Sequence, residues 1–465
     1  MFRYDLSVLV IETRNSKVRR MINDDMRLSS DSAMAREALA KAMYGMCLWK
    51  ADFMDDIKTA LSADPDFAMA HAVRALALTF GRHKRFLPMM RSGLEKAKAG
   101  STPLSAHENA YIEALEHAVD LRSDLAFEVY KRILDEHPCD MFIHRMAQMD
   151  LFNFGRNAEM YELVEKAAPH WSPEMRDYPI FMANRAFANE ESLHYAKAER
   201  YGRKSIELDP GDPWGAHAVA HVLLMQGRIE EGVDWLEGLS GNWAGKNQIV
   251  HHDYWHLCLF LLEQGEHERI LELYDSRVYN LESPLTKAMP DNVIDVTNAA
   301  SLLLRLELRG VDVGERWQVV AEPAEGRIDN HINPFTCAHA AVILAACGRF
   351  ETVDELIRSM TEFAYIDDGP AGVCMRKAAL PVAKAAIAHR KGDHEAVIAG
   401  FMPARHDLVA MGGSQAQRDV FIQILVDSCR QLGRKEELAQ LEEDIKTLGF
   451  EAVDQRTLYA DAFAP

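Results

Sequence analysis

Glycine-containing turns recur along this chain at the spacing of a helix pair. Residues 216–237 (AHAVAHVLLMQGRIEEGVDWLE) and 251–275 each read as an apolar helix, a turn with glycine and a second helix. Turns between paired helices, most of them with glycine, are predicted near residues 81, 119, 155, 190, 227, 265, 310, 348, 392 and 433, at spacings of 35 to 45 residues. Since one helix pair cannot cover its own apolar face, this periodicity predicts that successive pairs stack into one continuous array.

The repeat length indicates the class of array. Tetratricopeptide repeats (TPRs) have units of about 34 residues, and wider helical repeats reach about 47. We therefore predict an all-α protein, an α-solenoid of about ten or eleven TPR-like helix-turn-helix pairs that form a single domain over residues 23–445. Residues 446–465 are expected to be a C-terminal extension. Residues 1–22 are expected to be a tail or a segment added by a mis-called start, and they include the one alternating stretch, 7–13.

Composition limits the kinds of partner. The 465 residues carry a net charge of −19, and an acidic surface disfavours nonspecific binding to nucleic acids or anionic membranes. The seven cysteines form no CxxC motif, which fits reduced thiols in a cytoplasmic protein. No apolar stretch approaches the roughly 18–20 residues of a membrane span. We therefore expect a cytoplasmic protein that binds neither nucleic acid nor membrane.

Histidines recur at one helical phase relative to the turns. They lie six, nine or ten, thirteen or seventeen residues before a turn glycine. These offsets increase in steps of three or four, so the imidazoles share one face of their helices. Because the first helices of stacked pairs line the concave surface, we expect these side chains to converge inside the superhelix. The residues with this phase are His71, His217, His221, His252, His256, His331 and His339.

Several segments resemble the tetratricopeptide repeat protein 38 family. They are DPDFAMAHA (64–72), WGAHAVAHVLLMQGRIEEG (214–232), HHDYWHLCLFLLEQGE (251–266), GERWQ (314–318), DNHINPFTCAHAA (329–341) and GGSQAQRDVF (412–421). The resemblance implies an all-helical repeat fold, with the seven histidines, an acid at Asp295 and the run Gln417-Arg418-Asp419 as parts of the family pattern. The chain departs from that pattern at Gln148, Asp253 and Cys337. The resemblance assigns no reaction.

Two HxxxH motifs are candidate half-sites for a divalent metal such as zinc, because each places two imidazoles on one helix face. Together they offer four nitrogen ligands: His217, His221, His252 and His256. Asp295 or Asp253 would add an oxygen ligand or orient an imidazole. The zinc-protease pattern needs Glu after the first histidine, and Ala218 stands there. Two alternatives remain open: histidines that only pack in the inner wall, and a metal-free site that uses His as general acid or base.

Other residues are weaker candidates. Arg418, if it points inward, could hold a carboxylate or phosphate, and the alternative is an Arg418–Asp419 pair that clamps neighbouring helices. Trp255 either belongs to the core or forms the wall of a ligand pocket. Glu190 and Glu191 are expected to be solvated, with the alternative that Glu191 reaches the inner surface.

Two classes of function remain. The first is a binding module whose concave, histidine-rich channel holds a peptide or a small polar molecule, and such a chain could also form a homo-oligomer. The second is an enzyme, a hydrolase with a histidine-rich site that works either with a metal or without one. Its candidate catalytic residues are His221, His252, His256, Asp295 and His339. The candidate ligand-binding residues are His71, His217, Trp255, His331, Arg418 and Asp419.

Overall fold

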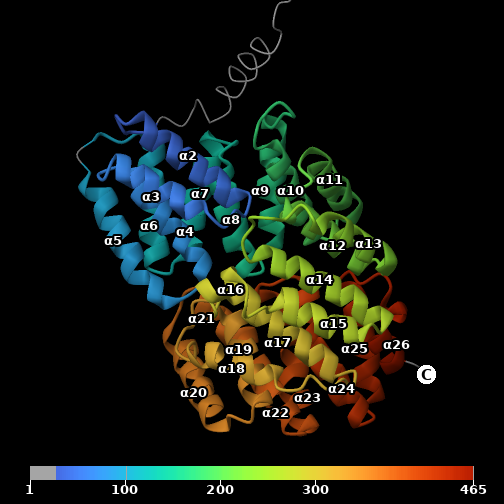
Figure 1. Cartoon of the computed structure of the whole chain (residues 1–465). Coiled ribbons are helices and arrows are strands. Elements are labelled where there is room, and N and C mark those ends of the chain that lie inside the picture. The colour runs from blue at the N-terminus through green and yellow to red at the C-terminus, as the bar shows by residue number, and fades with distance from the viewer. Residues whose placement is uncertain (1–27, 101, 464–465) are drawn as a thin grey trace, which may run out of the picture.

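Paired helices build the whole described part of the protein. The computed structural model describes residues 28–100 and 102–463, so the predicted tail at 1–22 lies outside it. No β-strand occurs in these ranges, and the predicted all-α, TPR-like solenoid is confirmed (Figure 1). The helices are α2 (Ala33–Cys47), α3 (Phe53–Ala63), α4 (Ala68–Ala77), α5 (Leu87–Ala99), α6 (Ala106–Val119), α7 (Ser123–Glu136), α8 (Met141–Asn153), α9 (Asn157–Ala167), α10 (Tyr178–Glu190), α11 (Tyr195–Leu208), α12 (Pro213–Met225), α13 (Ile229–Ser240), α14 (Ile249–Gln264), α15 (His267–Leu273), α16 (Pro284–Ala288), α17 (Val293–Glu307), α18 (Arg316–Glu325), α19 (Pro334–Ala346), α20 (Phe350–Ile366), α21 (Pro370–Cys374), α22 (Leu380–Arg390), α23 (His394–Phe401), α24 (Gln415–Gln431), α25 (Lys435–Thr447) and α26 (Thr457–Phe463).

Shorter helical segments connect some of these elements. The 3₁₀ segments are η1 (Leu78–Gly81), η2 (Lys84–Phe86), η3 (Ala168–His170), η6 (Met402–Met411) and η7 (Val453–Gln455), and the π turns are η4 (Tyr274–Val278) and η5 (Met375–Ala379). Within the described residues, no helix combines the length and the apolar character that crossing a bilayer requires.

The turns inside the helix pairs are left-handed. Gly265 ends α14 with φ of +75°, and its N–H bonds to the carbonyl of Leu262, which stops the helix. The same conformation occurs without glycine at Leu121 and Leu193, with φ of +58° and +62°. These two positions explain why the turns predicted near 119 and 190 carry no glycine although the chain reverses there.

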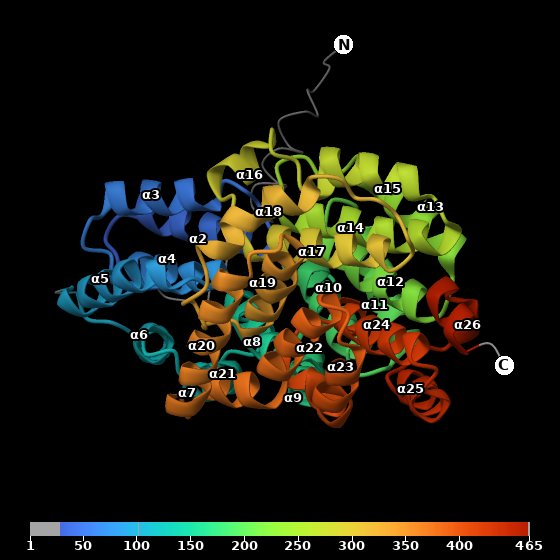
Figure 2. The ribbon, with the colours of Figure 1, turned by 90° about the horizontal axis from the view of Figure 1, so that it is seen from below.

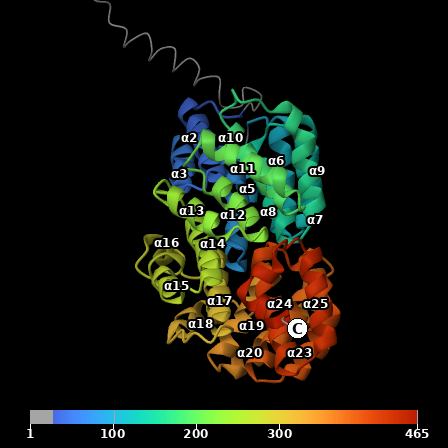
Figure 3. The ribbon, with the colours of Figure 1, turned by 90° about the vertical axis from the view of Figure 1, so that its right-hand side faces the viewer.

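The superhelix closes on itself. The blue α4–α5 pair lies beside the orange α19–α21 region (Figure 2), and hydrogen bonds and ion pairs form part of the contact. Arg85 of η2 binds Asp291 at 2.6 and 2.8 Å, and the backbone N–H of Lys84 donates to Oδ1 of Asn330 at 2.9 Å. Buried Arg327 donates to the backbone carbonyls of Asp291 and Arg82. The N-terminal and C-terminal helices therefore form two layers that face each other (Figure 3).

The C-terminal segment completes the second layer. Arg456 and Tyr459 contact Asp419 of α24, and Thr457 donates to Glu263 of α14. The backbone N–H of Glu451 also bonds to the carbonyl of Met225 at 2.9 Å. Residues near 449–463 thus pack against α12, α14 and α24.

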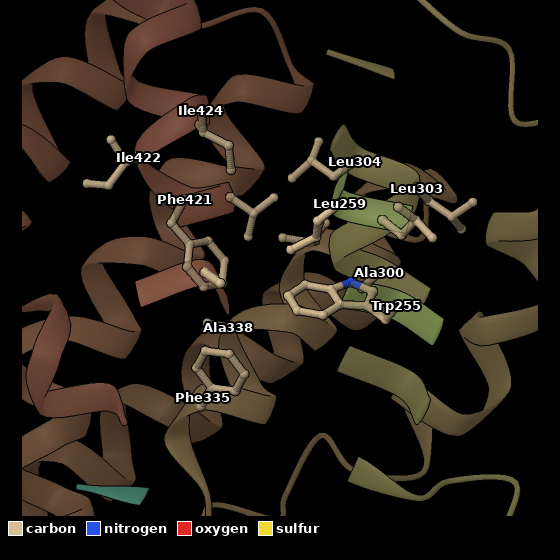
Figure 4. Close-up of a cluster of buried hydrophobic side chains, with 14 of the residues drawn as sticks. Trp255, Leu259, Ala300, Leu303, Leu304, Phe335, Ala338, Phe421, Ile422 and Ile424 are labelled. Carbon is tan, nitrogen blue, oxygen red and sulfur yellow. The ribbon is translucent and has the colours of Figure 1, made fainter. Parts of the chain in front are cut away.

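Two clusters of buried apolar side chains meet at α12 and α14. Trp214 of α12 and Ile249 of α14 belong to the N-terminal cluster. Val219 of α12 and Trp255 of α14 belong to the C-terminal cluster, where side chains of α14, α17, α19 and α24 gather (Figure 4). Any polar group on the inner faces of α12 and α14 is therefore enclosed between two apolar cores.

Two glycines test the closure of the superhelix. A Cβ at Gly265 would meet nothing within 4 Å, so Gly265→Ala should cost only the left-handed backbone strain, about 1–2 kcal/mol. At Gly155, which has φ of +63°, a Cβ would lie 1.8 Å from the carbonyl oxygen of Val409 in the other layer. Gly155→Ala should therefore lower the free energy of unfolding clearly more than Gly265→Ala in urea titrations. Equal losses would contradict the contact between the layers.

Candidate functional site

Four imidazoles meet between α12 and α14, the first helices of two neighbouring pairs. Each helix presents two histidines four residues apart, so both motifs face the same seam. Ligand-capable atoms of the four side chains all lie within 4.8 Å of one another, and no ring is more than 6% exposed. This four-histidine cluster consists of His217, His221, His252 and His256.

Three Nε2 atoms converge at its centre. Nε2 of His221 lies 2.9 Å from Nε2 of His217 and 3.0 Å from Nε2 of His256. An imidazole nitrogen carries either one proton or one lone pair in the ring plane. The two contacts therefore cannot both be well-aligned hydrogen bonds, whichever tautomers are present. A cation that accepts the lone pairs of all three rings removes this conflict.

Neighbouring residues fix the ring orientations. Nδ1 of His252 donates to Oδ1 of Asn298 at 2.9 Å, which leaves the lone pair on Nε2. Nδ1 of His221 lies 3.1 Å from Oε2 of Glu190, so that an N–H donated to this carboxyl oxygen likewise frees Nε2. Trp255 stacks on His252 with an interplanar angle of 10°. Such partners are the ones that orient histidine ligands at metal sites.

Burial keeps the imidazoles neutral. It lowers the pKa of His221 to about 4 and that of His252 to about 3. Burial, together with the neighbouring imidazoles, also lowers the pKa of His217 and His256 well below the usual value. Neutral imidazole is the form that binds metals, so all four side chains are available as ligands near neutral pH.

A buried acid pair adjoins the cluster, and the expectation that it is solvated is wrong. Glu190 ends α10, the first helix of the preceding pair, and the packing of α10 against α12 places Glu190 and Glu191 on the inner side beside His221. Burial raises the pKa of each carboxyl to about 8, although the Arg418 guanidinium opposes the shift. Asn157 donates to Glu191 at 3.1 Å. Sequence patterns gave no phase signal for this pair, because it lies at the helix end.

The other co-phased histidines lie in different places. Nε2 of His71 bonds to the carbonyl of Pro65 at 2.8 Å, six residues earlier. His144, outside the predicted set, bonds to the carbonyl of Pro138 at 3.0 Å in the same way. These two rings hold the proline turns between repeats. His331 bonds to Ser359, and His339 to the carbonyl of Phe335 at 2.9 Å.

The predicted acidic and basic candidates have other partners. Asp295 orients an imidazole, but that of His251 at 2.9 Å rather than one in the cluster. Asn298, three residues further along α17, accepts the hydrogen bond from His252 instead. Neither Asn298 nor His251 was predicted from the sequence as a site residue. Arg418 donates to the carbonyls of Gly412 and Gly413 near the acid pair.

Asp419 is not the partner of Arg418 in this structure. It contacts Arg456 at 3.2 Å, Arg305 at 3.7 Å and the hydroxyl of Tyr459, in a buried ion network. Because α24 places consecutive residues about 100° apart around its axis, the two side chains point in different directions.

A cavity of about 120 Å³ lies beside the cluster, between the two layers. His217 and His252 form part of its wall, so two of the four imidazoles border space that a small molecule could enter. A separate, half-buried group at the α22–α24 edge also has ligand spacing: His389, His394 and Asp427. None of these three residues lines the cavity, and Nε2 of His389 lies 2.7 Å from Oδ2 of Asp427.

No known family model matches the chain. Among solved structures, it is similar to a chain of the APC/C hetero-tetramer Cut9–Hcn1, with 13% identity over 84% of this chain and 72% of that one and a TM-score of 0.40. It is also similar to a chain of the human IFIT1 dimer with m7Gppp-AAAA, with 13% identity over 97% and 98% and a TM-score of 0.41. Both are TPR-like helical-repeat proteins. Similarity at this level does not extend to ligands or partners.

The acid pair predicts a pH dependence of stability in the metal-free protein. The folded carboxyls keep their protons up to a pH of about 8, whereas unfolded glutamate loses its proton near 4.5. The folded state thus binds more protons, and each group lowers stability as the pH rises between these values, by about 1.4 kcal/mol per pH unit. The buried histidines have the opposite effect on stability, because they bind fewer protons in the folded state than in the unfolded state. This effect occurs only below the pKa of 6.5 that histidine has in the unfolded chain.

Glu190→Gln removes one of these carboxyls. Between pH 6.5 and 8, chemical denaturation of the chelator-treated variant should show a shallower loss of stability with rising pH than the parent protein. A slope equal to that of the parent would contradict the protonated, buried state of Glu190.

Proposed function

We propose that the protein binds one divalent transition metal at the four-histidine cluster, inside a helical-repeat scaffold. The observation that carries this proposal is the convergence of three Nε2 atoms at 2.9 and 3.0 Å on His221. Neutral rings with fixed orientation and a common centre are what a metal site requires.

The donor set favours zinc or a related ion. Imidazole nitrogens suit zinc, copper, iron and nickel, whereas magnesium and calcium prefer oxygen ligands. A tetrahedral zinc ion with bonds of about 2.0–2.1 Å separates its ligand nitrogens by about 3.3 Å. The observed spacings are a few tenths of an ångström shorter, which small ring movements can supply. The nearby carboxyls of Glu190 and Glu191 are protonated near neutral pH in the metal-free protein, and by losing their protons they would offset part of the charge of the ion.

A hydrolase remains the second candidate function. His252 has no hydrogen bond to the other three rings, and it lines the cavity together with His217. A metal held by His217, His221 and His256 would leave a coordination position for water, and His252 would then be placed to accept a proton. Asp295 and His339 have partners outside the cluster, so this mechanism assigns them no direct step.

The fold supports a more general binding role as well. TPR-like repeats commonly act as scaffolds for protein partners, and a peptide or small polar molecule on the inner surface is consistent with this architecture. The resemblance to the tetratricopeptide repeat protein 38 family, a cytoplasmic location, the absence of nucleic-acid binding and a homo-oligomer all remain predictions.

Metal retention tests the proposal. The protein is equilibrated with zinc, desalted and examined by native mass spectrometry, together with His256→Ala and the control His389→Ala. The parent and the control should each retain one tightly bound ion per chain. His256→Ala should lose more than about 100-fold in affinity, because loss of an orienting partner alone costs 10–100-fold.

Two results would overturn the metal site. One is a His256→Ala variant that retains zinc as tightly as the parent protein while its circular dichroism is unchanged. The other is loss of the ion in His389→Ala alone, which would place it at the α22–α24 edge.

A further inference from the structure

Three ligand-capable side chains meet at the turn between α22 and α23, outside the four-histidine cluster. His389 lies in the last turn of α22, His394 is the first residue of α23, and Asp427 lies on the neighbouring α24. Gly392, with φ of +74°, reverses the chain between the two histidines. One potential ligand atom of each side chain lies within 4.8 Å of those of the other two. These three residues form the α22–α24 triad.

Neighbouring residues hold the triad in position. Nε2 of His389 lies 2.7 Å from Oδ2 of Asp427. Behind this pair, Nε2 of Gln431 donates to the other carboxylate oxygen of Asp427 at 3.3 Å. Oγ of Ser428 lies 3.1 Å from Nδ1 of His394. Hydrogen bonds of this kind, made by the atoms that face away from an ion, orient the ligands of metal sites.

The charge of Asp427 has no lysine or arginine partner. Among the described residues, its one ion pair is with His389. A neutral imidazole donates a hydrogen bond to a carboxylate but does not balance its charge. A divalent cation held between the three side chains would balance that charge and use the lone pairs of both rings.

The triad is open to solvent, in contrast to the four-histidine cluster. The side chains of His389 and Asp427 are 15% and 19% exposed, whereas no ring of the cluster is more than 6% exposed. Three protein ligands leave at least one coordination position of a tetrahedral ion for water. An ion at the triad would therefore exchange with the solution more easily than an ion enclosed by four imidazoles.

We propose that the α22–α24 triad is a second, weaker site for a divalent transition metal, which keeps water as a ligand. Two imidazoles and one carboxylate suit zinc or iron(II), whereas magnesium and calcium prefer oxygen ligands alone. Around a tetrahedral zinc ion, the 2.7 Å contact between His389 and Asp427 would widen to about 3.3 Å. The partly exposed side chains allow this movement. The site goes beyond the proposed function and does not depend on it.

Zinc titration of the full-length protein tests the second site. The protein is loaded with one equivalent of zinc and desalted, and further zinc is added in a calorimeter in a buffer that does not bind zinc. The parent protein should bind one further ion per chain. His394→Ala and Asp427→Asn should each weaken this second binding at least about tenfold, because loss of an orienting partner alone costs 10–100-fold. Neither variant should lose the ion retained after desalting.

His406→Ala is the matched control. His406 is also exposed and lies 3.9 Å from an aspartate, Asp444, but the two residues belong to no group with ligand spacing in the described part of the chain. The control should bind the second ion as the parent protein does. The proposal would be overturned by a parent protein that takes up no second ion, by triad variants that bind it undiminished, or by an equal loss in His406→Ala.

The same samples separate the two metal sites. A parent protein that retains no zinc after desalting, but binds one ion that is lost in Asp427→Asn, would overturn the four-histidine cluster alone. A parent protein that retains one ion and binds no second would overturn the triad alone.

Discussion

The packing of α12 against α14 is the interaction on which the site depends. Each helix carries two histidines one turn apart, and the register of the two helices brings Nε2 of His221 within 3.0 Å of Nε2 of His256. A shift of one residue along either helix would rotate its imidazoles by about 100° and out of the seam. The seam also joins the two apolar cores, so any movement there would disturb both layers.

Closure of the superhelix gives the cluster its environment. In an open solenoid the first helices would line a wet groove, and histidines there would titrate near 6.5. Here the second layer covers the groove, and Arg327 and Asn330 tie it to the carbonyl of Arg82. Burial is what lowers the pKa of His252 to about 3, and the space that remains beside the cluster is a pocket of about 120 Å³.

The sequence predicted the fold and the central part of the site, for identifiable reasons. Turn glycines and apolar periodicity are local signals, and they located the helix pairs. Phase relative to the turn predicted one shared inner face for all seven histidines, but His331 lies in the loop before α19 and not on a helix. Phase also does not specify which helices are neighbours. Convergence follows only where two such helices pack together, as α12 and α14 do. His71 shares the phase and instead bonds to the carbonyl of Pro65 within its own repeat.

Contacts between one helix pair and the next could not be predicted in this way. Glu190 lies at the end of a helix, where the periodicity of the apolar face no longer distinguishes inside from outside. Its burial depends on the packing of α10 against α12. Asp419 was expected to adjoin Arg418 in either a ligand site or a clamp, and its partners Arg456 and Tyr459 come from the C-terminal segment. Pairings of this kind depend on how one helix pair packs against the next, which no single repeat encodes.

The most direct test of the account is an anomalous difference map, recorded at the zinc absorption edge from crystals grown with zinc. The account predicts a strong peak at the centre of the four-histidine cluster, about 2.0–2.1 Å from Nε2 of His217, His221 and His256. A map without a peak at the cluster, in which the three nitrogens remain in mutual contact, would contradict the metal site and leave the histidines as packing residues.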